Sequence, residues 1–178
     1  MAFTISNFRE AIAKQHGIAR PNLFEVIVTS PPDTVKDKFA DFRFQCKMAT
    51  IPPSTMGVIE VSYFGRMIKI PGNRTFDNLS LTVINDEDYT IRNAIEKWMA
   101  LMNSHANNIQ EVEDVKDLFC GITISHFGVT DFPTGSWNFI NCFPVSLGEI
   151  SLDWGSNDTA EEFSVDFAYD YWTSAASS

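Results

Sequence analysis

The chain has 178 residues, of which 44% are hydrophobic and 20% are charged, as expected for one globular domain rather than a disordered segment. Its 23 acidic residues outnumber 13 basic ones and give a net charge of −10, which argues against a surface built to hold nucleic-acid phosphates. Fifteen phenylalanines imply large apolar faces that must be buried in a core or between subunits.

The first predicted element is a short amphipathic helix over residues 5–16, within an N-terminal helical arm of residues 1–20. Apolar residues at helical spacing, a capping serine and a glycine stop support it: Ile5, Phe8, Ile12, Ser6 and Gly17. Because so short a helix is marginal alone, we expect it to dock on its own domain or on a neighbour.

From Pro21 the hydrophobic pattern repeats every two residues, which is typical of strands. The predicted strands in this half are residues 22–28, 41–48, 57–72 and 77–84. In the second strand the pattern puts Phe42 and Phe44 on the same face. The third strand changes phase at Phe64 and Gly65, where we expect a bulge or a tight turn. Residues 49–55 are predicted as a loop because two prolines do not fit a central strand.

One substantial helix is predicted at about residues 86–103. Asn85 or Asp86 can cap its start, and an apolar stripe at helical spacing follows. After it comes a polar, acidic loop that carries no sharp motif and is expected at the surface.

The rest of the sequence is again typical of strands. They are expected at residues 122–129, 137–143, 145–154 and 161–172, followed by a flexible tail over residues 173–178. The predicted fold class is therefore mainly β: an antiparallel β-sandwich or barrel with one substantial helix and a short N-terminal helix. No linker or repeat divides the chain, so we expect a single domain over residues 1–178.

No residue pattern points to an enzyme, a cofactor or a metal site. None of the three histidines lies at ligand spacing from a second histidine or a cysteine: His16, His105 and His126. The three cysteines are odd in number and widely spaced, so we expect reduced, mostly buried thiols: Cys46, Cys120 and Cys142. The acidic run 86–88 lacks the glycine and the distal glutamate of a calcium loop, and helix capping explains it.

The start of the chain is amphipathic, and it lacks the basic residues followed by a long apolar run that are typical of a signal peptide. No stretch of 18 apolar residues occurs in the sequence. We therefore expect neither a signal peptide nor membrane insertion by this chain. The protein is expected to stay where it is made, or to leave only as part of an assembly.

The most informative segment is residues 162–171, where aromatic and β-branched residues alternate with acidic or small ones. A half-buried strand with a solvated face explains this alternation. Glu162, Asp166 and Asp170 share the polar face, however, and like charges on one strand face repel each other modestly. Because all three charges are negative, we look for a functional explanation of this face.

Five blocks of the sequence resemble the tail tube protein family of T-even-like contractile phages. They occur in the family's order and cover most of the chain: ARPNLFEV (19–26), FQCKMATIPPS (44–54), RMIKIPGNRTFDNLSLTVINDED (66–88), FPVSLGEISLDWGSND (143–158) and FSVDFAYDYW (163–172). The chain departs from the family around residues 30–42 and beyond Trp172.

The resemblance implies a β-sandwich-like structural subunit that forms six-membered rings, which stack helically into a tube. It implies a contractile sheath around the tube, tape measure protein inside it, and baseplate and tail terminator proteins at its ends. Phage DNA would pass through without specific binding. Such a protein is made in the host bacterial cytoplasm and ends up in the tail of the virion.

For such an assembly we predict contacts between subunits at the N-terminal helix and the proline-rich loop: Phe8, Ile12, Ile51, Pro52, Pro53 and Met56. The simpler alternative is that these residues cover their own core. The acidic residues Glu162, Asp166 and Asp170 are predicted to face the lumen or solvent. An acidic bore suits a DNA conduit because each Lys or Arg that neutralised a phosphate would add a hold on the DNA.

Two alternatives remain open at this stage. The first is a tube subunit of a phage-derived injection or secretion system, which gene neighbours would distinguish. The second is a free β-sandwich that binds a carbohydrate or another ligand, or an enzyme on that scaffold. Exposed aromatic residues such as Trp137 and Trp154 would support stacking on sugars, although packing in a core or an interface is the favoured explanation for them.

Overall fold

In the computed structural model, the described residues are 4–14, 18–107, 109–110, 112, 114–129 and 132–177. The strands are β1 (Phe24–Thr29), β2 (Cys46–Thr50), β3 (Ser54–Tyr63), β4 (Arg66–Phe76), β5 (Leu79–Ile84), β6 (Cys120–Phe127), β7 (Pro133–Leu147), β8 (Glu162–Ala168) and β9 (Tyr171–Ser174). The helices are α1 (Ile5–Lys14), α2 (Phe42–Gln45) and α3 (Thr90–Met102), with 3-10 turns η1 (Lys36–Phe39) and η2 (Val115–Leu118). The predicted mainly β, antiparallel class is confirmed. The predicted end of the first helix, including Gly17, lies outside the described residues.

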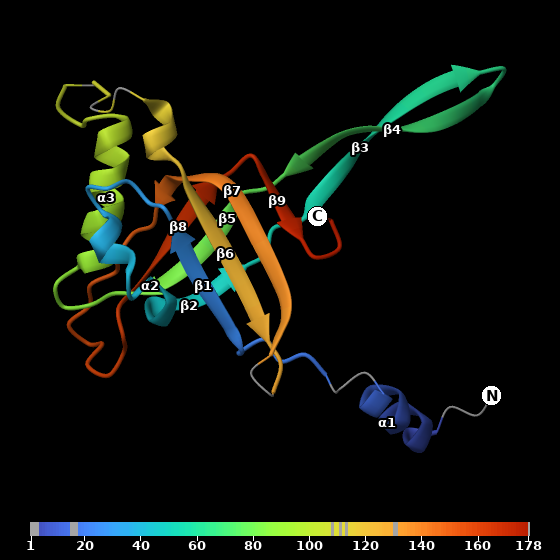
Figure 1. Cartoon of the computed structure of the whole chain (residues 1–178), viewed down its shortest axis with the longest axis horizontal. Helices are drawn as coiled ribbons and strands as arrows, with labels where there is room; N and C mark the ends of the chain where they lie inside the picture. The colour runs from blue at the N-terminus through green and yellow to red at the C-terminus, as the bar shows by residue number, and fades with distance from the viewer. Residues whose placement is uncertain are drawn as a thin grey trace.

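Seven strands form one sheet in the order β1-β6-β7-β8-β5-β2, with β9 also paired to β7 (Figure 1). All of its pairings are antiparallel. Strands β8 and β9 continue the same register along β7, since Ala168 pairs with Phe143 and Tyr171 pairs with Ile140. They are two halves of one strand that breaks near Asp170. Strands β3 and β4 form a separate two-stranded sheet that projects from the body.

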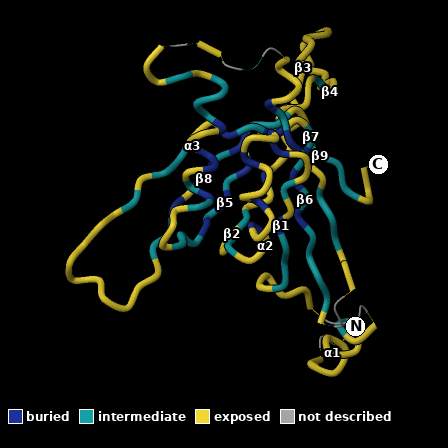
Figure 2. The backbone as a smooth tube through the Cα atoms, turned by 60° about the vertical axis from the view of Figure 1, so that its left-hand side comes forward, coloured by how far each residue is buried: buried dark blue, intermediate teal, exposed yellow. Residues whose placement is uncertain are grey.

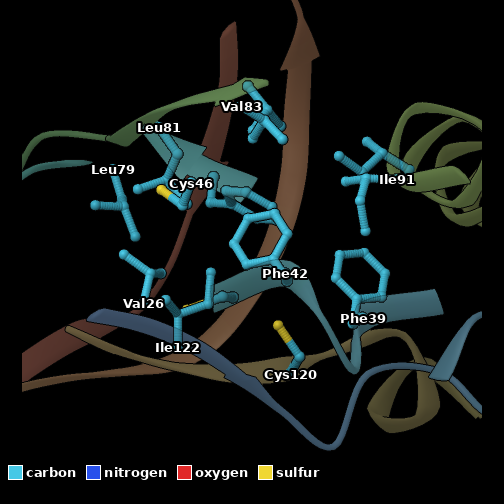
Figure 3. Close-up of a cluster of buried hydrophobic side chains, with 14 of the residues drawn as sticks. Val26, Phe39, Phe42, Cys46, Leu79, Leu81, Val83, Ile91, Cys120 and Ile122 are labelled. Atoms are coloured by element: carbon cyan, nitrogen blue, oxygen red, sulfur yellow. The ribbon is translucent and has the colours of Figure 1, made fainter. Parts of the chain in front are cut away.

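The core is built from alternate residues of the large sheet, closed by α2, η1 and α3 (Figure 3). Trp98 of α3 is fully buried, and its indole N–H donates a hydrogen bond of 2.9 Å to the carbonyl oxygen of Leu118. Its ring packs edge-on against Phe39, with centroids 6.0 Å apart. Through these two contacts, Trp98 connects α3 to the end of η2 and to η1.

The predicted helix near 86–103 exists but begins later, at Thr90. The predicted N-cap position is corrected to Tyr89, which makes no side-chain cap bond, but Asp86 still serves the start of the helix, because its carboxylate oxygen accepts the backbone N–H of Thr90 at 2.7 Å. Residues 86–89 form a turn, in which Tyr89 adopts φ = 53° and its N–H bonds to the carbonyl oxygen of Asp86. The acidic run therefore precedes the helix instead of filling its first turn.

Asp86→Ala should lower the free energy of unfolding by about 1 kcal/mol at pH 7, the usual cost of losing a helix cap. Hydrogen bonds from the Thr90 side chain and then its backbone lower the pKa of Asp86 below its usual range. This stabilisation is therefore complete above the unfolded-state pKa and is lost as the pH falls through the folded-state pKa. Urea unfolding of both proteins at pH 7 and pH 3 should show a smaller difference at pH 3. An equal difference at both values would contradict the assignment.

The predicted strand over residues 41–48 is wrong in its first half. Phe42 and Phe44 do not share a face, since Phe42 is fully buried and Phe44 is 70% exposed. Phe39 and Phe42 are three residues apart, as on a helix, and their rings pack 5.6 Å apart in the core. Phe39 ends η1 and Phe42 begins α2, and burying both rings delays the start of β2 to Cys46.

The predicted strands 137–143 and 145–154 are also corrected, because β7 runs unbroken to Leu147 and residues 148–161 contain no strand. Gly148 marks the exit from the sheet. A Cβ at this position would lie 2.3 Å from the Ser164 hydroxyl oxygen, and the Gly148 N–H bonds to the Ser164 carbonyl at 2.7 Å. The chain can turn away this close to β8 only because residue 148 has no side chain.

Candidate assembly surfaces

The most prominent exposed feature is the hairpin of β3 and β4, which we call the arm (residues 54–76). Each strand is ten residues or longer, and the two are joined by Phe64 and Gly65 alone. Both turn residues have positive φ, 44° and 78°, which is the two-residue turn whose twist suits a hairpin. The turn predicted at these residues is confirmed.

One face of the arm is apolar and uncovered. Ile59 pairs with Ile70 and Val61 pairs with Ile68 on this face, and all four side chains are 43–54% exposed. The opposite face carries an ion pair between Glu60 and Lys69, with nitrogen and oxygen 3.6 Å apart.

The arm lies outside the core along almost its whole length, with no residue of either strand buried (Figure 2). An isolated two-stranded hairpin is at best marginally stable, and a large exposed apolar patch marks an interaction site. Three basic residues and one acidic residue give the arm a net charge of +2, so the rest of the chain carries −12. The arm is therefore suited to another protein surface that is apolar and acidic.

The N-terminal helix is a second uncovered element. Phe8 is 65% exposed, Ile12 is half-buried and no described residue of α1 is buried. In both views of the chain, α1 lies apart from the sheet (Figures 1 and 2). Docking on its own domain, one of the two expectations for this helix, is therefore not seen in the single chain.

The proline-rich loop is shorter than predicted, because β2 extends to Thr50 and β3 begins at Ser54. Within it, Ile51 and Pro53 are exposed, whereas Pro52 is buried within its own chain. Met56 is 44% exposed and belongs to the base of the arm.

The predicted acidic strand is only partly continuous. Glu162 pairs with Lys47, and Asp166 is half-buried on the same strand. Asp170 lies in the break after β8, where it accepts a hydrogen bond of 2.6 Å from the Asn141 side-chain amide. Of the alternating apolar residues, Phe163, Val165 and Phe167 are buried as expected, Tyr169 is half-buried and Tyr171 is 47% exposed.

The last third of the chain is uniformly acidic, since residues 117–178 hold nine carboxylates and no Lys or Arg. Its loop over residues 148–161 exposes Trp154 completely. Trp137, by contrast, is half-buried and packs against the core. Of the two tryptophans considered for sugar stacking, only Trp154 lies free at the surface.

Within the described ranges, no three His, Cys, Asp or Glu side chains gather as metal ligands would. His126 bonds through Nε2 to the Arg20 carbonyl oxygen at 2.8 Å and through Nδ1 to the Thr134 hydroxyl at 2.9 Å. Burial raises the pKa of the Cys46 thiol to about 12, which keeps it protonated and unreactive. His16 lies outside the described residues. None of the helices in the described part of the chain has the length and apolar character needed to cross a membrane.

The length and exposure of the arm were not anticipated from the sequence. Alternation along residues 57–72 predicts a strand with one apolar face but does not say which surface covers that face. The available signal was the charge, because Arg66, Lys69 and Arg74 gather in one segment of an acidic chain.

Comparison with known proteins identifies relatives over most of the chain. The family described as "Phage tail tube protein" matches residues 18–175. Tail tube protein gp19 of Enterobacteria phage T4 is 30% identical over 154 residues, which cover 86% of this chain and 90% of that protein. The tail tube protein of Serratia phage KSP90 is 25% identical over 167 residues, with coverages of 93% and 94%.

Solved structures share the fold at lower sequence identity. A chain of the sheath-tube complex of an extracellular contractile injection system (PVC), in its extended state, has a TM-score of 0.62 and 21% identity. The alignment covers 97% of this chain and 98% of that chain. A chain of the anti-feeding prophage tube-terminating cap also has a TM-score of 0.62, with 23% identity and coverages of 88% and 90%.

Proposed function

Because the chain belongs to the phage tail tube protein family, we propose that it is the repeating structural subunit of the inner tube of a contractile phage tail. The observation that carries this proposal is the family match over residues 18–175. The chain is thus a component of the virion tail, and the role proposed for it is structural. The injection-system alternative shares the fold, but the relatives at 25–30% identity are phage proteins.

The uncovered surfaces support a subunit that completes its fold by assembly. Within the part of the chain that the structure describes, the apolar face of the arm lacks a partner, and strands β1 and β2 each have one neighbour in the sheet. Pairing such edges between subunits satisfies their backbone groups and closes a ring. In our proposal, six subunits form a ring, and rings stack through contacts that repeat without closing, which generates a tube. Phe8, Ile12, Ile51, Pro53 and Met56 remain proposed contacts between subunits.

The partners follow from this role. A sheath surrounds the tube, baseplate and terminator proteins bind its ends, and tape measure protein fills the lumen before DNA passes. The ligand-binding alternative is the weaker one, because only Trp154 of its two aromatic candidates is exposed.

Assembly of the purified chain tests this proposal. Size-exclusion chromatography and negative-stain microscopy should show rings or tubes as the protein concentration rises. Glycan binding by a stable monomer that assembles under no condition would overturn it in favour of the ligand-binding alternative.

The tube should not retain DNA. Glu162, Asp166 and Asp170 are proposed to face the lumen or solvent, where carboxylates repel phosphates. Tubes sedimented with short duplex DNA at low salt should leave the DNA in the supernatant, whereas Asp170→Lys tubes should pellet some of it in a salt-dependent manner. Salt-sensitive binding of DNA by the unmodified tubes would contradict a non-adhesive surface.

A further inference from the structure

A pocket of about 650 Å³ opens between the two edge strands of the large sheet. Its lining is mainly apolar and comes from both edges and from the strands between them: Phe24, Met48, Ile51, Ile124, His126 and Trp137. This volume falls within the range of pockets that bury most of a bound group.

The pocket is a gap where the core reaches the surface. Phe24 of β1 and Trp137 of β7 both pack against the core, and Ile124 between them is buried. Met48 on the opposite edge is 55% exposed. An apolar floor with an exposed apolar rim favours an apolar occupant over water.

The two polar side chains of the lining that can carry a positive charge already have partners. His126 makes the two hydrogen bonds described above, and Lys47 is paired with Glu162. Neither group therefore calls for a polar ligand.

The tip of the arm carries aromatic side chains that suit the apolar lining of the pocket. Phe64 is 91% exposed and Tyr63 is 63% exposed, and their rings pack edge to face with centroids 4.6 Å apart. Aromatic side chains of this kind, set in a pocket, are the residues that typically dominate interface energies.

An arm cannot reach the pocket of its own chain. Ile51 in the pocket is only three residues before the arm begins at Ser54, and ten residues of strand carry the tip about 33 Å away. The arm extends straight from the body (Figure 1). A contact between tip and pocket therefore joins two copies, and it is heterologous because the two surfaces differ.

We propose that the pocket between β1 and β2 receives the aromatic tip, Tyr63 and Phe64, of another copy of this chain. The inference rests on the proposed tube function and names one surface through which two subunits of the tube are joined. The overall charges of the arm (+2) and of the rest of the chain (−12) attract each other. The pocket lining itself contains Lys47 and no carboxylate, so the fit of the aromatic tip to the apolar lining carries the assignment. Phe8 of α1 and Trp154, which are 65% and 101% exposed, are two competing candidates among the other exposed aromatic residues.

Cysteine cross-linking of assembled tubes distinguishes these occupants. Met48→Cys serves as the reporter in the pocket and is combined in turn with Phe64→Cys, Phe8→Cys or Trp154→Cys. The native cysteines are buried, so we expect them not to form cross-links. Copper phenanthroline, as the oxidant, should link only the Phe64→Cys pair, giving a ladder of covalent multimers on a non-reducing gel. Tubes that cross-link through Phe8→Cys or Trp154→Cys instead, or through no pair, would overturn the proposal.

A second measurement uses the unmodified protein, in case a double variant fails to assemble. Oxidation of Met48 by hydrogen peroxide, followed by mass spectrometry, should slow by about fivefold or more on assembly, because a filled pocket buries most of its lining. An unchanged rate in intact tubes would contradict occupancy of the pocket. Failure of the unmodified chain to form tubes would instead count against the proposed function itself.

Discussion

Replacing Val61 and Ile68 together with aspartate should prevent tube assembly while leaving the subunit folded. The two residues face each other on the apolar side of the arm and are 43% and 49% exposed in the single chain. Losing their burial between subunits removes about 3 kcal/mol or more per subunit, and the new carboxylates oppose burial further. The concentration needed for assembly should therefore rise by roughly 100-fold or more.

The matched control is Ser62→Asp, which adds a charge to the opposite face of the same strand. We expect this variant to form tubes. Sedimentation measures the assembled fraction, and thermal unfolding of the unassembled subunits should change little, as is usual for surface substitutions. The account fails if the double variant assembles normally, or if both variants lose assembly equally.

Trp98→Ala should cause the largest loss of subunit stability, about 3–5 kcal/mol. The indole is fully buried, donates to the Leu118 carbonyl, and packs against Phe39 and Phe167. The substitution leaves a cavity and an unpaired buried carbonyl. The expected loss is a large part of the free energy of unfolding of a typical domain, which is about 5–15 kcal/mol.

Urea unfolding of the unassembled subunit measures this loss. Trp154→Ala is the control, because Trp154 is completely exposed and its truncation should change the unfolding free energy by less than about 0.5 kcal/mol. Similar losses in the two variants would mean that Trp98 does not hold α3 to the core.

Much of the fold follows from local pattern. The alternation of Phe163, Val165 and Phe167 correctly predicts a strand with one buried face, and the phase change at Phe64 correctly places the hairpin turn. The strand prediction was wrong at Phe42 and Phe44. These residues show the same alternation as residues 163–167, but a single turn of helix buries Phe42 beside Phe39. Contacts distant in the sequence decide such a choice.

The assembly surfaces were less predictable than the fold. An apolar strand face has the same sequence pattern whether its own core or another subunit covers it. The pattern at Val61 and Ile68 therefore does not show that these residues lie outside the body. Asp170 appeared to continue the acidic row of β8, but the strand breaks there, opposite Asn141 with its φ of 56°. Alternation cannot reveal such a break, because it depends on the register with β7.

A cryo-EM map of tubes assembled from the unmodified chain tests the central claim most directly. The account predicts stacked six-membered rings in which each arm leaves its own subunit and buries its apolar face, Ile59, Val61, Ile68 and Ile70, against a neighbouring copy. Particles without ring symmetry, or rings whose arms remain exposed to solvent, would contradict it.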